Sequence, residues 1–216
     1  MLAIPGLDEL LRQQRALRLE PVTDDFVWLT GDYHLDVIHA SAGRITRNYS
    51  LRIATPQAFP QDYPVVYEVG NAIPRHPDWH VNIHDGSLCL GSRLGLKLEL
   101  KAKPYLAKFL SVTLDPFLYA VAVKLETGRP FVFGELRHGG AGVVQDLAER
   151  LRIPECAVPG AFALLAQPDA VARLQGCPCG CNRTLAECET YQRVCTIRSL
   201  ESPEWFAEMS VQLTAE

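Results

Sequence analysis

The sequence lacks an excess of basic residues and a long uninterrupted apolar run. Its 21 Lys and Arg stand against 25 Asp and Glu, for a formal net charge of −4, so we expect no broad basic surface and no nucleic-acid partner. The most apolar stretch, residues 105–125, is interrupted by charged residues and Pro116, which does not fit a membrane span of about 20 apolar residues. Asp8 and Glu9 stand where a secretory signal would be apolar. We therefore expect a cytoplasmic protein that makes no contact with a membrane.

The sequence also lacks the even cysteine count of a simple disulfide framework. Of its seven cysteines, five lie between Cys177 and Cys195, whereas Cys89 and Cys156 stand alone. In the reducing cytoplasm, clustered thiols are more often metal ligands than disulfides. We expect Cys156 to pack in a core, and the other cysteines to carry chemistry.

The chain is long enough for one domain and an appended segment. It has 216 residues, of which 48% are hydrophobic and 21% charged, and a domain averages about 150 residues. Residues 153–175 are rich in proline and glycine and have the composition of a linker with one or two short helical pieces. We expect a first domain over residues 1–152, then a linker and cysteine-rich tail over residues 153–216.

Periodicity predicts an α+β fold for the first domain. Four runs alternate apolar and polar residues or carry β-branched and aromatic residues, which predicts an antiparallel four-stranded meander. The predicted strands are residues 26–30, 33–39, 45–53 and 65–69. Helical spacing lies outside the strand region, as expected when helices are segregated from the sheet. The predicted helices are residues 7–19, 104–114, 116–126 and 143–151, with Asp115 as an N-cap before Pro116.

The segment between the last predicted strand and the later helices concentrates reactive side chains. Residues 74–90 contain three histidines, Asn82 and Cys89. Asp85, Gly86 and Ser87 predict a tight turn just before Cys89. A lone intracellular cysteine is often a small core residue, but this neighbourhood makes Cys89 a candidate nucleophile.

This loop resembles the active-site loop of the ubiquitin-conjugating enzymes. His80-Val81-Asn82 followed by Gly86-Ser87-Leu88-Cys89-Leu90 is similar to that family's His-Pro-Asn and Gly-Ser-(Ile/Leu)-Cys-Leu segments. The element order and Tyr63-Pro64 match the family over residues 1–152. Val81 replaces the usual proline, the Asn82–Cys89 spacing is one residue shorter, and a second proline and a downstream tryptophan are missing. The resemblance is therefore to a divergent member, similar to bacterial conjugating-enzyme-like proteins of phage-defence operons.

The resemblance implies a ubiquitin-conjugating fold and a thioester-forming transferase. Cys89 would carry the activated C-terminus of a ubiquitin-like protein, received from an activating enzyme and passed to an amine of a target protein. Asn82 would donate its amide where charge develops on the thioester oxygen, or it would only pin its own loop. His80 and His84 are candidate bases or unremarkable loop residues.

Two other functions are compatible with the residues. An inactive relative of the same fold would serve as a binding or scaffold module. A cysteine peptidase would pair Cys89 with His138 or His84 as base.

The tail carries a metal-binding pattern. Cys177, Cys179 and Cys188 have the spacing Cys-x-Cys-x₈-Cys, which resembles the zinc knuckle called SEC-C. Dense thiols with Pro and Gly between them suit a tetrahedral structural zinc. That family has a further Cys or His where this chain has Glu189, so Cys195 is our fourth ligand.

Two alternatives remain open for the tail. Cys181 is the runner-up as fourth zinc ligand, and some of the cysteines could instead form disulfides or simply pack. We expect residues 184–194 to be helical and the tail to have almost no hydrophobic core, so that metal binding would supply most of its folding energy.

Overall fold

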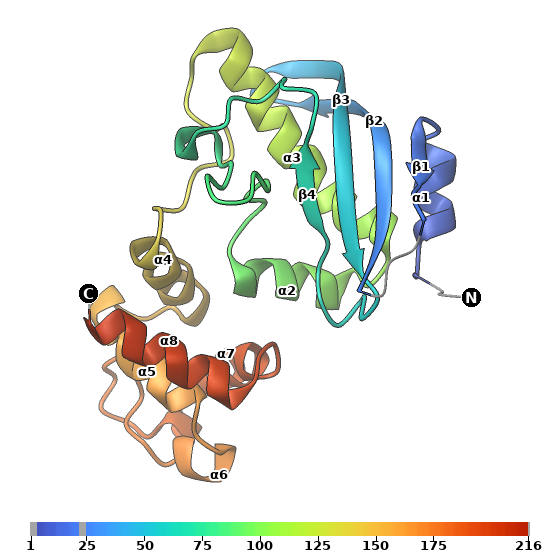
Figure 1. Cartoon of the computed structure of the whole chain (residues 1–216). Helices are drawn as coiled ribbons and strands as arrows, with labels where there is room; N and C mark the ends of the chain where they lie inside the picture. Colours follow the sequence, from blue (N-terminus) through green and yellow to red (C-terminus); the bar gives the residue numbers. More distant parts are fainter. Residues whose placement is uncertain (1–3, 22–24, 216) are drawn as a thin grey trace. The chain divides into compact units, whose positions relative to one another are not determined.

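The computed structural model describes residues 4–21 and 25–215, and the chain divides into two compact units, of which the first ends at Glu135 and the second begins at Leu136 (Figure 1). The first unit combines helices with one four-stranded antiparallel sheet, which confirms the α+β class. The second unit is built from helices and turns over the residues described. The predicted boundary at residue 152 lies inside the second unit, directly after α4 (Gly140–Leu151).

The sheet of the first unit is a simple meander. Its strands lie in the order β1-β2-β3-β4, and every neighbouring pair is antiparallel. The elements of this unit are α1 (Leu7–Gln13), β1 (Leu17–Leu19), β2 (Phe26–His39), β3 (Gly43–Pro56), β4 (Val65–Glu68), a 3-10 turn (Pro77–Trp79), α2 (Arg93–Ala102) and α3 (Leu106–Thr127).

The two strands predicted on either side of Gly31 are one strand in the structure. Gly31 was expected to end a strand, but β2 continues through it and pairs with β3 along its whole length. Gly31 has φ 136°, and a Cβ there would lie 2.1 Å from the carbonyl oxygen of Ala16. The glycine therefore permits a close approach of the chain beside β1, not a turn. The segment of β1 was expected to extend the first helix, which instead ends at Gln13.

The predicted break before Pro116 is also absent, because α3 is one continuous helix. Asp115 does not cap a helix; its carboxylate accepts a hydrogen bond of 2.6 Å from the Tyr33 hydroxyl. An interior proline costs about 3 kcal/mol, whereas each fully buried leucine contributes about 1.5–3 kcal/mol. Leu110, Leu114 and Leu118 are all fully buried, so packing outweighs the proline.

Helix α2 was missed because its leucines alternate as in a strand. Leu94, Leu96 and Leu100 are buried in the structure. The signal that could have found it is Ser92, whose hydroxyl accepts a hydrogen bond of 3.0 Å from the Gly95 amide and caps the helix.

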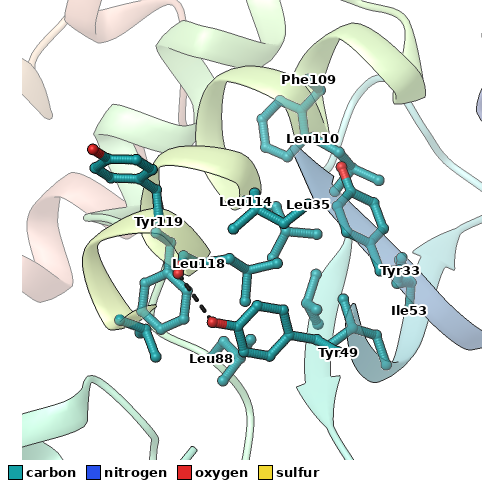
Figure 2. Packing of buried hydrophobic residues seen from close by; sticks show 14 of the residues in the cluster. Tyr33, Leu35, Tyr49, Ile53, Leu88, Phe109, Leu110, Leu114, Leu118 and Tyr119 are labelled. Carbon is teal, nitrogen blue, oxygen red and sulfur yellow. Dashed lines mark hydrogen bonds between the residues drawn. The ribbon is translucent and has the colours of Figure 1, made fainter. Parts of the chain in front are cut away.

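The core of the first unit lies between the inner face of the sheet and α3 (Figure 2). Tyr49 of β3 is fully buried there, and its hydroxyl donates to the carbonyl of Leu118 at 3.2 Å. Leu88, from the cysteine loop, joins the same cluster. The loop is thus attached directly to the core that the sheet and α3 build.

Helix α3 is long and apolar enough to cross a membrane by length and composition alone. Of its most apolar window, 72% is buried inside the fold. Such burial is that of a core helix.

The second unit has its own hydrophobic core, so the expectation of an almost coreless tail was wrong. Phe162 and Phe206 are fully buried, with ring centroids 6.2 Å apart, and Leu185 and Val194 are fully buried as well. The elements are α4, a 3-10 turn (Glu155–Ala157), α5 (Val158–Leu165), α6 (Asp169–Ala172), a second 3-10 turn (Leu185–Glu187), α7 (Thr190–Arg198) and α8 (Pro203–Ala215).

The packing of α3 on the sheet predicts a large cost for removing one of its buried leucines. Leu118→Ala should destabilise the first unit by about 2–5 kcal/mol through lost burial and a cavity. Ile38→Ala, at a side chain 72% exposed, is the matched control and should change stability by less than about 0.5 kcal/mol. Hydrogen–deuterium exchange of β3 peptides measures both, and equal protection in the two variants would contradict the packing described.

Candidate functional site

The cysteine loop is a short hairpin, residues 80–89, attached to the sheet by main-chain pairing. Val81 and Leu88 form an antiparallel bridge across it, and Tyr67 of β4 pairs with Ser87. The Leu88 amide donates to the Val66 carbonyl at 2.8 Å. Isolated β-bridges and main-chain hydrogen bonds therefore hold the site hairpin and fix its register.

That register decides which side chains face solvent. Val81 and Leu88 are 4% and 6% exposed and point into the core. Because successive side chains alternate, Asn82 and Cys89 lie on the opposite face, and both are exposed. The Cys89 amide donates to the His80 carbonyl at 2.7 Å, so its backbone is fixed as well.

The predicted tight turn is present at Gly86. Its φ is 77°, which a glycine adopts without strain, and its amide donates to the Asn82 carbonyl at 2.8 Å. Asp85 accepts from the Ser87 amide at 2.9 Å and from the Ser87 hydroxyl at 2.8 Å. These hydrogen bonds hold the pKa of the Asp85 carboxyl below its ordinary value, chiefly through the Ser87 amide, so the group is ionised at neutral pH.

The structure places Asn82 in the hydrogen bonds of its own loop. Its Nδ2 donates to Ser87 Oγ at 2.7 Å, and its main-chain amide donates to the Ser87 carbonyl at 2.9 Å. In the described part of the chain, the second N–H of the side-chain amide has no partner. Pinning the loop therefore occupies only one of the two donors, and a role in catalysis stays a prediction.

The thiol of Cys89 is accessible but partly desolvated. The residue is exposed, and its Sγ lies 3.9 Å from the Gly91 carbonyl oxygen. Desolvation by the surrounding protein atoms raises the pKa of the thiol, opposed by a backbone hydrogen bond at Gly91. The sulfur is therefore a neutral thiol at neutral pH and must lose its proton to act as a nucleophile.

The candidate base histidines lie in different environments. His80 adopts a left-handed backbone, φ 52°, and its ring packs edge-on to Phe131 at 4.8 Å. Its Nε2 lies 3.3 Å from a Glu135 carboxylate oxygen. His84 is exposed on the turn, and His138 belongs to the second unit. The cysteine-peptidase alternative therefore stays a prediction.

The second candidate site is a cluster of four thiols. Cys177, Cys179, Cys181 and Cys188 have all four sulfurs within 4.8 Å of one another and could hold a metal ion. The Sγ atoms of Cys177 and Cys179 are 3.2 Å apart, and those of Cys179 and Cys188 are 3.6 Å apart.

A tight β-turn structure brings these thiols together. Gly176 and Thr184 form an isolated antiparallel bridge, and the Cys177 amide donates to the Arg183 carbonyl at 2.9 Å. Between them, Gly180 and Asn182 have positive φ of 80° and 59°. Two left-handed residues in so short a segment reverse the chain, and Cys181 turns back toward the other sulfurs.

The fourth sulfur of this group belongs to Cys181, the runner-up, and not to Cys195, which was the predicted fourth ligand. The predicted helix over residues 184–194 is interrupted, since Cys188 has an extended backbone between the 3-10 turn and α7. Cys195 lies inside α7 and outside the four-thiol group. The sequence signal that favoured Cys181 is that Gly180 and Asn182, residue types that readily adopt a left-handed backbone, stand on either side of it.

The environments of the thiols in the cluster differ. The hydrogen bond between Cys188 Sγ and Thr190 Oγ1, with the Thr190 backbone in support, lowers the pKa of Cys188 to about 6. Burial raises the pKa of Cys177 to about 12.

Cys156, which was expected to pack, is exposed instead.

No protein-family model matches this chain, and no curated protein or solved structure shows significant similarity to it.

The raised pKa of Cys89 predicts slow alkylation at neutral pH. Since only the thiolate reacts, the rate of iodoacetamide labelling, followed by peptide mass spectrometry, should rise about tenfold per pH unit up to the thiol pKa. It should level off at a higher pH than free N-acetylcysteine does. A Cys89 rate already constant between about pH 6 and 8 would show a depressed pKa and contradict this environment.

Proposed function

We propose that this chain is a ubiquitin-like-protein conjugating enzyme that carries an acyl group on Cys89. The observation that carries the proposal is the exposed thiol of Cys89 directly after a core-anchored residue, Leu88, on the same hairpin face as Asn82. The resemblance of this loop to the ubiquitin-conjugating enzymes, and the antiparallel meander that precedes it, support the same assignment.

The chemistry comprises two acyl transfers. The Cys89 thiolate attacks the C-terminal thioester carbonyl of the ubiquitin-like protein, a new C–S bond forms, and the thiolate of the activating enzyme leaves. An amine of the target then attacks the Cys89 thioester, an amide bond forms, and the Cys89 thiolate leaves and takes up a proton. The hairpin contributes by holding the sulfur in one place at the protein surface.

Asn82 is the proposed donor to the oxygen that becomes negative in each transfer. Its second N–H has no partner among the residues described, and it lies on the exposed face of the site hairpin. Removal of one such donor lowers the rate by about 10²–10³-fold in enzymes that stabilise an oxyanion.

We also propose that the four-thiol cluster holds a structural zinc. A tetrahedral zinc with Zn–S bonds of about 2.3 Å has sulfur–sulfur edges of about 3.8 Å. The observed separations of 3.2 and 3.6 Å, with the others under 4.8 Å, are close to this geometry. Four thiolates complete a tetrahedral shell and leave no open position, which is the arrangement of a structural site.

The proposed partners are a ubiquitin-like protein, an activating enzyme and a target protein. On the basis of the resemblance to bacterial conjugating-enzyme-like proteins, we propose that the reaction takes place in the cytoplasm, within a defence pathway against phage. Reduced thiols at Cys89 and in the metal cluster are compatible with that compartment.

The zinc proposal predicts about one zinc ion per chain by elemental analysis. Cys181→Ser should lose most of the metal, because it removes one of four clustered sulfurs. Cys195→Ser is the matched control and should retain it. Metal loss from the Cys195 variant with retention in the Cys181 variant would reverse the ligand assignment, and metal-free wild type with free thiols would remove the site.

The conjugation proposal predicts a covalent adduct on Cys89. The chain should be incubated with ATP and with an activating enzyme and ubiquitin-like protein taken from genes that neighbour its own. Gel electrophoresis should show an adduct that a thiol reductant cleaves, and Cys89→Ser should give an adduct that resists the reductant, because an ester replaces the thioester. An unchanged, reductant-sensitive adduct in Cys89→Ser would contradict the assignment, and failure to form any adduct would favour a binding module.

A further inference from the structure

A chain of side-chain hydrogen bonds runs along the site hairpin toward the Asn82 amide. Asn82 Nδ2 donates to Ser87 Oγ at 2.7 Å, and Ser87 Oγ donates in turn to Asp85 Oδ1 at 2.8 Å. Ser87 is only 5% exposed although Asp85 and Asn82 on either side are exposed. The hydroxyl is therefore held by protein groups on both sides, away from bulk water.

The direction of donation in this chain is fixed by Asp85. An ionised carboxylate has no hydrogen to donate, so the single hydrogen of the Ser87 hydroxyl must point to it. The oxygen of Ser87 can then only accept from Asn82, which requires the Nδ2 side of the amide, not its carbonyl oxygen, to face Ser87. The Ser87 main-chain amide also donates to Asp85 Oδ1, at 2.9 Å, and this second hydrogen bond holds the carboxylate in position.

Asp85 also replaces a regular partner in the hairpin ladder. In a regular antiparallel pair the Ser87 amide would donate to the Asn82 carbonyl, but that carbonyl accepts from Gly86 at 2.8 Å instead. The turn thus commits its carboxylate to Ser87 through both main chain and side chain.

We infer that Asp85 and Ser87 are positioning residues that orient the Asn82 amide for acyl transfer at Cys89, an inference that rests on the proposed function. Cys89 follows Ser87 by two residues and shares its side of the hairpin register, so the amide lies diagonally across from the thiol. With the relay in place, the amide presents its second N–H toward the reacting carbonyl. With the amide inverted, its carbonyl oxygen would face the developing negative charge and repel it.

The test uses a small acyl donor, so that no partner protein is needed. Phenyl thioacetate acetylates Cys89 of the full-length chain, and free lysine then removes the acetyl group by aminolysis, which intact-mass spectrometry and peptide mapping follow. Asn82→Ala should slow aminolysis about 10²-fold. Ser87→Ala and Asp85→Asn should each slow it by about tenfold, and Asp85→Asn does so with little change in size, because the new amide can donate to Ser87 and allow the Asn82 amide to invert.

A coupling measurement separates positioning from a role in the turn alone. In an Asn82→Ala background, Ser87→Ala and Asp85→Asn should have no further effect on aminolysis, because the amide they orient is gone. Ser50→Ala is the matched control: Ser50 Oγ donates to Asp32 at 2.7 Å in a similar serine–aspartate pair on the sheet, and aminolysis should stay at the wild-type rate. Thermal unfolding of each variant reports separately on folding.

The inference is overturned if Ser87→Ala and Asp85→Asn react within about twofold of wild type, or if their effects multiply with that of Asn82→Ala. It is overturned too if Asn82→Ala itself has no effect. Failure of the activating-enzyme assay alongside the expected coupling would remove the proposed conjugating function and keep the relay. A normal thioester with unaffected Ser87 and Asp85 variants would do the reverse.

Discussion

The pairing of the site hairpin with β4 is the constraint on which the candidate site depends. The hydrogen bond from the Leu88 amide to the Val66 carbonyl, with Val81 and Leu88 buried beneath, sets the register of the whole hairpin. A slip of one residue would turn Cys89 into the core and expose Leu88. Leu88 packs in the cluster between the sheet and α3. The same packing therefore stabilises the first unit and holds the thiol in place.

The two cysteine sites are built by opposite means. The Cys89 thiol is placed by isolated β-bridges that attach the site hairpin to the core of the first unit. The four clustered thiols are placed by a short segment with left-handed Gly180 and Asn182 and by the extended backbone at Cys188. The second unit also has a hydrophobic core around Phe162 and Phe206, so the proposed metal would fix the turn and would not have to substitute for a core.

The parts of the fold that depend on local pattern could be predicted from the sequence. Alternation predicted an antiparallel meander, although it divided β2 in two and missed β1. Asp85-Gly86-Ser87 predicted the turn, and cysteine density predicted a cluster of thiols that could hold a metal ion. That Asn82 and Cys89 share the exposed face of the hairpin could not be predicted, because it depends on the burial of Val81 and Leu88, which only the structure shows.

The errors arose where distant contacts override a local signal. Gly31 has the sequence signature of a turn, but the structure uses the glycine in a different way. The Ala16 carbonyl lies so close to it that there is no room for a side chain. Pro116 and Asp115 have the signature of a helix start, yet leucine burial and the Tyr33 hydroxyl keep α3 continuous. The choice of Cys181 over Cys195 depended on left-handed backbone at two residues, which spacing alone does not encode. Neither conjugation nor zinc binding follows from the fold itself, since both rest on particular side chains.

The central claim is that position, and not mere exposure, makes Cys89 the acyl carrier. Cys89 and Cys156 are both exposed, but only Cys89 lies on the core-anchored hairpin. The direct measurement is site-resolved mass spectrometry of the seven cysteines while the chain turns over with its activating enzyme and ubiquitin-like protein. The acyl group should be found on Cys89 and be absent from Cys156; an acyl group on Cys156, or one distributed over the exposed cysteines, would contradict the account.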